Sequence, residues 1–199
     1  GFVVMDGIDG TTNASRRIPF YCCSLAYAPE FRLSAVTHAA VIDLATGDLY
    51  HATKGKGAFC NGRRIKVGQP AATGKDLVVG MSTSDTSPEV VRRLSPLMFK
   101  KIHIRQLGAI ALEMCLLARG QLDACIDIRG KIRPTDIAAA CLIVREAGGS
   151  VYSGASGGQE QQLDAALGVE TRISLVAAAH RQAFEELLAA GVFNAQQHT

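Results

Sequence analysis

The pattern of apolar residues changes near residue 70, and this change most constrains the fold. Before it, from about Phe20 to Val67, short apolar runs alternate with turn residues. Asn61-Gly62 suits a type I′ turn, in which both central residues have positive φ, and Thr46-Gly47-Asp48 suits another hairpin turn. The runs themselves are residues 21–27, 35–44 and 49–52. This part of the chain is therefore predicted to form an antiparallel sheet.

After a turn-rich stretch at residues 68–74, strand-like and helix-like runs alternate. The predicted strands are residues 77–82, 102–106, 124–128, 151–152 and 173–178, and the predicted helices are residues 87–97, 109–118, 136–147 and 180–190. Alternation of this kind predicts helices packed in layers on a sheet. We therefore expect an α+β domain at residues 1–74 and an α/β domain at residues 75–199, with a solvated loop at residues 154–162.

The composition is that of an ordinary globular protein. The chain has 199 residues, of which 48% are hydrophobic, and its net charge of +3 is spread along the sequence. A nucleic-acid or membrane surface needs a dense basic tract, which the sequence lacks, so neither is an expected partner. No targeting peptide or long apolar span is visible, which favours a cytoplasmic protein, although Gly1 is not an initiator methionine. The six cysteines lack metal-ligand spacing and are predicted to be reduced core residues.

Two carboxylates lie directly behind the first apolar run, which is predicted to be a strand. Asp6 and Asp9 are followed by Gly10, Thr11 and Thr12. Carboxylates at the end of a strand supply the hard oxygen ligands that Mg²⁺ prefers. The turn that the glycine and the two threonines open leaves N–H groups free to face an anion. The segment is therefore predicted to hold a cation and a phosphate together.

A further carboxylate, Asp136, is predicted to begin a helix that Gly148-Gly149 ends. One interpretation makes Asp136 an N-cap that accepts hydrogen bonds from N–H groups one turn further along. The other makes it a third metal ligand that reaches the site from the second domain. By itself the residue favours the cap, and the segment around it shifts the interpretation towards the ligand.

These two segments resemble signatures of the Mg²⁺-dependent, lithium-sensitive inositol monophosphatase superfamily. Residues 6–13 are similar to D-P-I-D-G-T-T-N, and residues 136–149 are similar to W-D-x-A-A-x-x-L-I-x-x-E-A-G-G, in the same order along the chain. Residues 105–115 and 123–129 look most like archaeal-type members, which hydrolyse both fructose 1,6-bisphosphate and inositol phosphates. The resemblance implies a layered αβαβα sandwich of the sugar-phosphatase type that is incomplete at its N-terminus.

The resemblance also implies a role for each matching residue. Two or three Mg²⁺ ions are implied, with the ligands Asp6, the main-chain carbonyl of Ile8, Asp9 and Asp136. The N–H groups of Gly10 and Thr11 are implied to hold the phosphate, and the Thr11 hydroxyl is implied to orient the attacking water. Mg²⁺ chemistry of this kind needs little from the protein beyond oxygen ligands and positioning.

The same comparison places the rest of the substrate. Its ring or chain is implied to lie beside Gly108, Ala109 and Ile110, which are small enough to let it approach. Arg129 matches a position at which archaeal-type members carry arginine and inositol-specific members carry an acid. A guanidinium can grip a second phosphate bidentately, as a bisphosphate requires. Arg105 is a second candidate for this contact, and its alternative is a solvated surface charge.

We therefore expect a phosphomonoesterase that acts on fructose 1,6-bisphosphate, inositol 1-phosphate or both, by direct attack of water. The sequence shows no nucleophile with a partner base, so a phosphoenzyme intermediate is not expected. Two alternatives stay open: a phosphatase of the same superfamily for a 3′-phosphonucleotide or NADP, and a catalytically silent truncated domain. A homodimer is implied by the resemblance alone.

Three residues depart from the signatures without removing a ligand. Gly7 replaces proline, Ala14 replaces an aromatic residue and Thr135 replaces tryptophan. The family also has a paired-glutamate segment near its N-terminus, whose glutamate binds metal, and no such segment precedes Asp6. Glu113 and Glu146 lie in predicted helices and match other family positions. We therefore expect either a fragment of a longer protein or a relic without activity.

Overall fold

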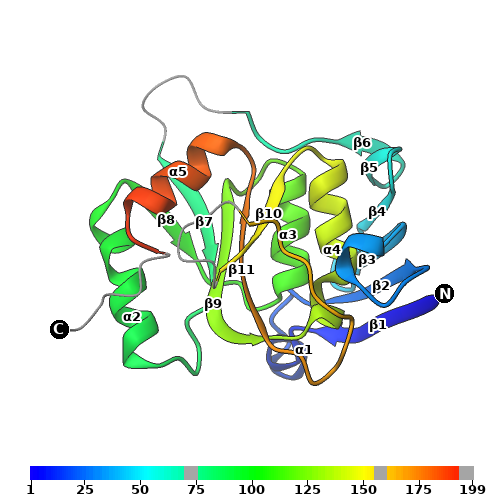
Figure 1. Cartoon of the computed structure of the whole chain (residues 1–199), viewed down its shortest axis with the longest axis horizontal. Coiled ribbons are helices and arrows are strands. Elements are labelled where there is room, and N and C mark those ends of the chain that lie inside the picture. Colours follow the sequence, from blue (N-terminus) through cyan, green and yellow to red (C-terminus); the bar gives the residue numbers. More distant parts are fainter. Residues whose placement is uncertain (70–75, 155–160, 193–199) are drawn as a thin grey trace.

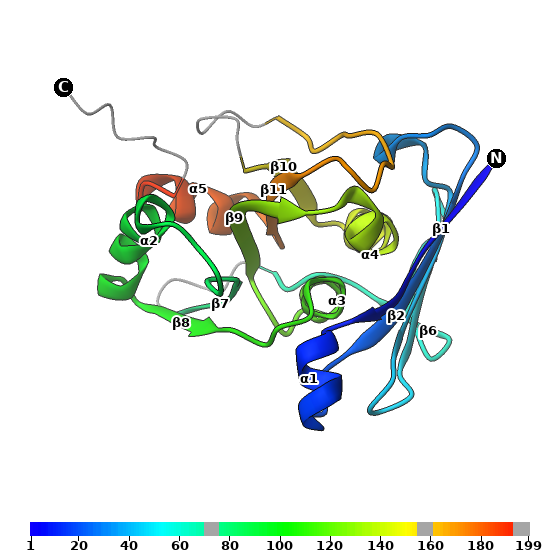
Figure 2. The same cartoon turned by 90° about the horizontal axis from the view of Figure 1, so that it is seen from below.

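The computed structural model describes residues 1–69, 76–154 and 161–192. These residues form two sheets, with one pair of helices between the sheets and another pair on the outer face of the second sheet (Figures 1 and 2). The layer order is therefore sheet, helices, sheet, helices. This arrangement confirms the predicted layered sandwich of helices and sheets.

The first sheet is antiparallel throughout, as predicted. It consists of β1 (Phe2–Asp9), β2 (Cys22–Ala28), β3 (His38–Asp43), β4 (Leu49–Thr53), β5 (Gly57–Cys60) and β6 (Arg63–Ile65), which pair in sequence order. Between β5 and β6, Asn61 and Gly62 have φ values of 49° and 75°, as the predicted type I′ turn requires. Short hairpin connections thus fix the order of the strands.

The predicted run at residues 35–44 is wrong at its start. A short 3₁₀ helix, η1 (Leu33–Ala35), comes before β3, which begins only at His38. The carboxylate of Asp164 holds this turn, because it accepts from the Ser34 N–H at 3.1 Å and from Arg32 Nε at 3.0 Å. A contact across 130 residues leaves no signal in the local pattern.

The second sheet is mixed. Its strands are β7 (Leu77–Met81), β8 (Ile102–Arg105), β9 (Ala124–Ile132), β10 (Ser150–Ser153) and β11 (Ile173–Ala178), in the spatial order β10-β11-β9-β7-β8. β7 pairs in parallel with β8 and β9, whereas β11 pairs antiparallel with β9 and β10. β9 extends beyond the predicted Ile128, because Ile132 pairs with Ile173 at the far end of β11.

The helices are α1 (Thr11–Arg16), α2 (Pro88–Leu94), α3 (Ile110–Ala118), α4 (Pro134–Glu146) and α5 (Arg181–Ala189). α2 ends before the predicted Leu97 and continues as the 3₁₀ helix η2 (Ser95–Phe99). Pro96 has no N–H to donate to the carbonyl of Arg92, and the Ser95 hydroxyl donates to that carbonyl at 2.9 Å instead. The proline therefore explains the shorter helix.

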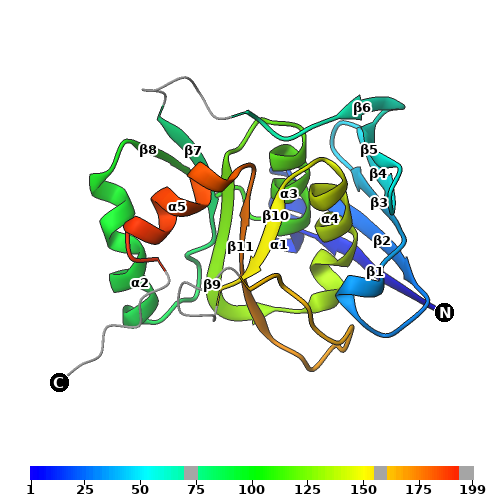
Figure 3. The same cartoon turned by 45° about the horizontal axis from the view of Figure 1, so that its top comes forward.

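The main core lies between the two sheets, around α3 and α4 (Figure 3). The alanines Ala138, Ala139 and Ala140 are at most 1% exposed, so they let α4 approach both of its neighbours closely. A second apolar cluster lies between the second sheet and the helices α2 and α5. On the first sheet, Val3 and Met5 are 68% and 64% exposed.

The proposed division at residue 74 lies outside the described residues and stays a prediction. β1 to β6 come from residues before it and β7 to β11 from residues after it, and a single apolar cluster joins the first sheet to α3 and α4. All six cysteines are unpaired, as predicted, and only Cys23 is not buried. Within the described residues, the helices are too short or too polar to cross a membrane.

Candidate active site

The first strand ends in an irregular turn that carries the two aspartates of the opening motif. The register between β1 and β2 shifts between Asp6 and Asp9, so the two carboxylates do not follow the simple alternation of a strand. The Ile8 N–H donates to Asp6 Oδ1 at 3.3 Å. Gly10 then takes the left-handed conformation, with φ 87°, and caps α1. The motif therefore forms the predicted strand and turn, and the short helix α1 follows them directly.

Gly10 also lies too close to its neighbours for a side chain. A Cβ atom there would lie 3.0 Å from Ala109 Cβ and 3.1 Å from the Phe20 carbonyl oxygen. The first N–H groups of a helix have no partner within it, and those of Thr11 and Thr12 begin α1 directly after this glycine. Both threonines are exposed, so the start of α1 can face solvent or a bound anion.

Asp9 is the most buried carboxylate of the motif. Its Oδ2 accepts from the Ala111 N–H at 2.7 Å and contacts the Cys22 thiol at 4.0 Å. The pKa of Asp9 is raised to about 7; burial is the largest cause, the Ala111 hydrogen bond acts against it, and the charges of Asp6, Asp136 and Glu113 contribute to the increase. A cation beside Asp9 would therefore stabilise the ionised carboxylate strongly.

Asp136 is not an N-cap, and the helix does not begin at this residue. α4 begins at Pro134, so Asp136 is the third residue of its first turn. Its Oδ2 accepts from the Arg133 N–H at 3.0 Å, which is the reciprocal half of a capping box. Pro134 supplies the helical φ at the first position, which moves the start of α4 two residues upstream.

Asp136 nevertheless lies near the motif. Its charge raises the pKa of Asp6, after the larger effect of burial, and it contributes to the raised pKa of Asp9. The tertiary structure thus brings a carboxylate from the first turn of α4 to the two aspartates at the end of β1. The capping and metal-binding interpretations of Asp136 are compatible, since a carboxylate has several lone pairs.

These carboxylates suit a hard divalent cation by their chemistry. Asp6, Asp9, Asp136 and the Ile8 carbonyl offer only oxygen donors, which favour Mg²⁺ over softer metals. Within the residues that the structure describes, no three His, Cys, Asp or Glu side chains are already close enough to hold a metal ion.

Asn13 connects the motif to a loop that follows β8, and sequence reasoning assigned it no role. Its Nδ2 donates to the Phe20 carbonyl at 2.8 Å and to the Leu107 carbonyl at 2.7 Å. Gly108 has φ 87°, and a Cβ there would lie 3.1 Å from Asn13 Nδ2. A buried asparagine in a helix of six residues is the signal that points to such a contact.

The loop therefore lies against the motif, where the predicted substrate residues are found. Gly108 is exposed and Ile110 is half-buried, so both can contact a bound molecule. Ala109 is 1% exposed and faces Gly10, so its side chain fills the core beneath the loop. Of the three residues, Ala109 therefore cannot offer its side chain to a bound molecule, and only its backbone and its small size could matter there.

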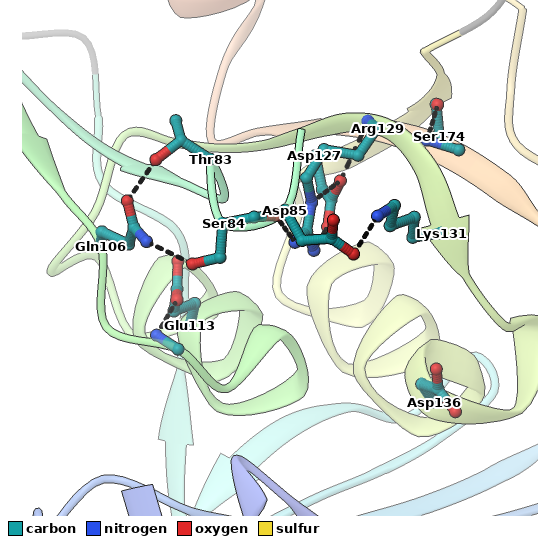
Figure 4. Close-up of polar contacts among 12 residues, drawn as sticks. Thr83, Ser84, Asp85, Gln106, Glu113, Asp127, Arg129, Lys131, Asp136 and Ser174 are labelled. Atoms are coloured by element: carbon teal, nitrogen blue, oxygen red, sulfur yellow. Dashed lines mark hydrogen bonds and ion pairs between the residues drawn. The ribbon is translucent and has the colours of Figure 1, made fainter. Parts of the chain in front are cut away.

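Arg129 is held by a carboxylate that sequence reasoning did not single out. Its Nε and Nη2 donate to Asp127 at 2.9 and 2.5 Å, and its Nη1 donates to the Ser84 carbonyl at 2.7 Å (Figure 4). The hydrogen bonds to Asp127 raise the pKa of Arg129. A guanidinium has five N–H donors, so two remain for another acceptor. The spacing of Asp127 and Arg129 could have predicted this contact, because residues two apart in a strand point to the same face of the sheet.

Other polar side chains surround Arg129 (Figure 4). Lys131 pairs with Asp85, and the Thr83 hydroxyl donates to Gln106. Gln106 in turn donates to the Ser84 hydroxyl at 2.7 Å. Arg105 is exposed at the end of β8, and its Nη1 donates to the carbonyl of the preceding residue at 3.0 Å. Polar groups thus gather towards the C-terminal ends of the parallel strands β7, β8 and β9.

Comparison with known proteins matches residues 2–196 to a family described as the inositol monophosphatase family. A fructose-1,6-bisphosphatase/inositol-1-monophosphatase of Methanothermobacter thermautotrophicus is 37% identical over 197 residues, which is 93% of this chain and 65% of that protein. The chain thus spans somewhat less than two thirds of this relative's length.

Two solved structures are similar over most of the chain. A crystal structure described as inositol monophosphatase-fructose 1,6 bisphosphatase has a TM-score of 0.82 and 30% identity, and it covers 94% of this chain and 69% of that one. A structure described as IMPase/NADP phosphatase complexed with Mg²⁺ and phosphate has a TM-score of 0.76 and 26% identity, with 98% and 67% covered.

Proposed function

Because the chain belongs to the inositol monophosphatase family, we propose that it hydrolyses phosphate monoesters with Mg²⁺, and that fructose 1,6-bisphosphate, inositol 1-phosphate or both are its substrates. One observation carries the proposal. The charge of Asp136 acts on both Asp6 and Asp9, and Asp9 directly precedes the turn at Gly10 from which α1 begins. This arrangement supports neighbouring sites for a cation and a phosphate.

In this proposal the protein mainly holds and orients the reactants. Asp6, the Ile8 carbonyl, Asp9 and Asp136 bind two or three Mg²⁺ ions, which would neutralise the phosphate and lower the pKa of a bound water. The Gly10 and Thr11 N–H groups hold the phosphate, with Thr12 beside them at the start of α1. The Thr11 hydroxyl orients the water for in-line attack. The hydrogen bond from Ala111 keeps the Asp9 carboxylate at a fixed place for this task.

A second phosphate has a plausible partner in Arg129. Asp127 fixes the plane of the guanidinium, and two N–H donors remain for a distant phosphate group. Arg105, the last residue of β8, is the further basic side chain that we propose for this contact. The loop from Gly108 to Ile110 borders the sugar or polyol between the two phosphates.

Phosphate release from both substrates in the presence of Mg²⁺ would test the proposal. We expect Asp9→Asn and Asp136→Asn each to lower kcat/KM by about 100-fold or more. Asp123→Asn is the matched control. Asp123 also accepts a backbone N–H, from Val78 at 2.8 Å, but it precedes β9 and belongs to neither segment of the proposed metal site. Undiminished turnover in both variants would refute the metal assignment. A wild-type chain without turnover would support the silent-domain alternative.

A second candidate substrate has support from one structural neighbour. The structure described as IMPase/NADP phosphatase matches 98% of this chain and 67% of its own chain. The proposed alternative is therefore NADP or a 3′-phosphonucleotide, and the same assay with these compounds would decide between the substrates. We further propose a cytoplasmic homodimer by analogy with the family, which sedimentation of the purified protein and localisation of a tagged copy would test.

A further inference from the structure

Glu113 is a buried carboxylate that the proposed reaction does not use. It lies in the first turn of α3 and is 1% exposed. Burial raises its pKa to about 7, while backbone hydrogen bonds from Gly108, Leu107 and Ala109 act against this increase. Burying a carboxylate is unfavourable unless it is well paired. If the side chain at this position only filled space, an apolar residue would make the folded protein more stable than a carboxylate does.

The contacts of Glu113 face the loop that precedes its own helix. Oε1 accepts from the Gly108 N–H at 2.9 Å, whereas Oε2 is buried without a hydrogen-bond partner among the described residues. A Cβ atom on Gly80 in β7 would lie 2.5 Å from Oε2. Gly80 does not have a positive φ, so its backbone does not require glycine. The glycine instead gives the carboxylate the space to reach Gly108.

The other side of the same loop is attached to the aspartate motif. Asn13 donates to the Leu107 carbonyl at 2.7 Å, and the Ala111 N–H donates to Asp9 Oδ2 at 2.7 Å. Residues 107–111 are thus held between the motif on one side and Glu113 on the other. Without Glu113, the Gly108 N–H would lose its acceptor, and the loop would lose its attachment on the side of α3.

We propose that Glu113 is a positioning residue, which accepts the Gly108 N–H and thereby fixes the substrate-facing loop and, through Ala111, the carboxylate of Asp9. The substrate-facing character of the loop rests on the proposed function. The contacts among Glu113, Gly108 and Asp9 do not.

Replacement by leucine separates this role from a merely structural one. Glu113→Leu keeps the approximate volume and removes both the acceptor and the desolvated charge. We expect an unchanged or higher melting temperature, about tenfold faster hydrogen exchange at the Gly108 amide, and about tenfold weaker Mg²⁺ binding by calorimetry. kcat/KM should fall by a similar factor. Glu113→Gln keeps a carbonyl acceptor for Gly108 and should restore most of each loss.

Glu146 offers a matched control. Its carboxylate accepts the N–H groups of Gly55 and Gly57 at 2.7 and 2.8 Å, so it fixes a loop by the same chemistry. That loop joins β4 to β5, in the first sheet. Glu146→Leu should therefore leave Gly108 exchange and Mg²⁺ affinity unchanged, whatever it does to stability.

Unchanged Gly108 exchange and Mg²⁺ affinity in Glu113→Leu would overturn the proposal. Equal losses in the leucine and glutamine variants would also overturn it, because the charge and not the acceptor would then matter. If the leucine variant does not fold, Glu113→Gln decides: a protected Gly108 amide with near wild-type Mg²⁺ affinity supports the proposal, and loss of either contradicts it. A wild-type protein without turnover would refute the proposed function, whereas amide exchange tests Glu113 without any turnover.

Discussion

The N–H of Ala111 donates to Oδ2 of Asp9 at 2.7 Å, although 102 residues separate the two. This bond joins the end of β1 to the first turn of α3, and so joins the opening motif to the loop beside it. Asp9 is therefore half-buried and hydrogen-bonded, and its partial removal from water has the larger effect on its pKa. Its ionisation should therefore change near neutral pH.

Asp9→Asn should raise the thermal stability of the protein in the presence of a chelator. The pKa of Asp9 is about 7 in the folded chain and lower in the unfolded chain, so the folded state binds more protons between about pH 4 and 7. Stability therefore falls as pH rises through this range, and asparagine removes that loss. Melting curves at pH 5 and pH 8 would check this. If the gain in melting temperature of Asp9→Asn over the wild type is larger at pH 5 than at pH 8, the pKa of Asp9 is not raised on folding.

Mg²⁺ binding should weaken below pH 7. A cation must displace the proton of Asp9, so its affinity should fall by up to about tenfold per pH unit on the acid side. Calorimetry at pH 6 and 8, in two buffers with different ionisation enthalpies, would measure both the affinity and the protons released. An equal dissociation constant at both pH values, with no proton release, would contradict the prediction.

Gly10→Ala should destabilise the protein and distort the turn that we propose to hold a phosphate. The φ of 87° is unfavourable for alanine, and the new Cβ would lie 3.0 Å from Ala109 Cβ. We expect a loss of about 1–3 kcal/mol in the free energy of unfolding, measured by urea titration. Gly7→Ala is the control, because a Cβ there has no neighbour within 4 Å. Similar losses in both variants would show that general backbone stiffening, and not this turn, is responsible.

Removal of Arg129 should be more harmful than removal of Lys131. Asp127 is fully buried and Arg129 is 19% exposed at its side chain, so Arg129→Met leaves an unpaired buried charge. We expect a loss of about 3–5 kcal/mol in the free energy of unfolding. Replacing both partners, as Asp127→Leu with Arg129→Met, should recover most of it.

Lys131→Met is the control for this pair. Lys131 and its partner Asp85 are both largely exposed, so the solvent screens their interaction and stability should not change measurably. Urea titrations of the four proteins would compare the pairs directly. If the Arg129→Met protein is as stable as the Lys131→Met protein, the ion pair between Arg129 and Asp127 does not stabilise β9 as predicted.

Local patterns were sufficient for most elements. The turn at Asn61 and Gly62 and the strand and glycine turn of the opening motif follow from preferences of neighbouring residues. Local patterns failed where a distant group decides. Asp164 holds the 3₁₀ turn before β3, and Ile173 extends β9 to Ile132. For the start of α4, Pro134 was a local signal that sequence reasoning passed over in favour of Asp136.

The sequence by itself determined that Asp6, Asp9 and the Gly10 turn are available for the proposed metal and phosphate sites, because these residues lie in one short segment. Only the tertiary structure decided their surroundings. Asp9 became a carboxylate with a raised pKa because β1 and α3 bury it together. Asn13, Glu113 and Asp127 gained their roles from partners that packing brings near. Burial and hydrogen bonding between distant segments set these properties, and neither is encoded in the spacing of neighbours.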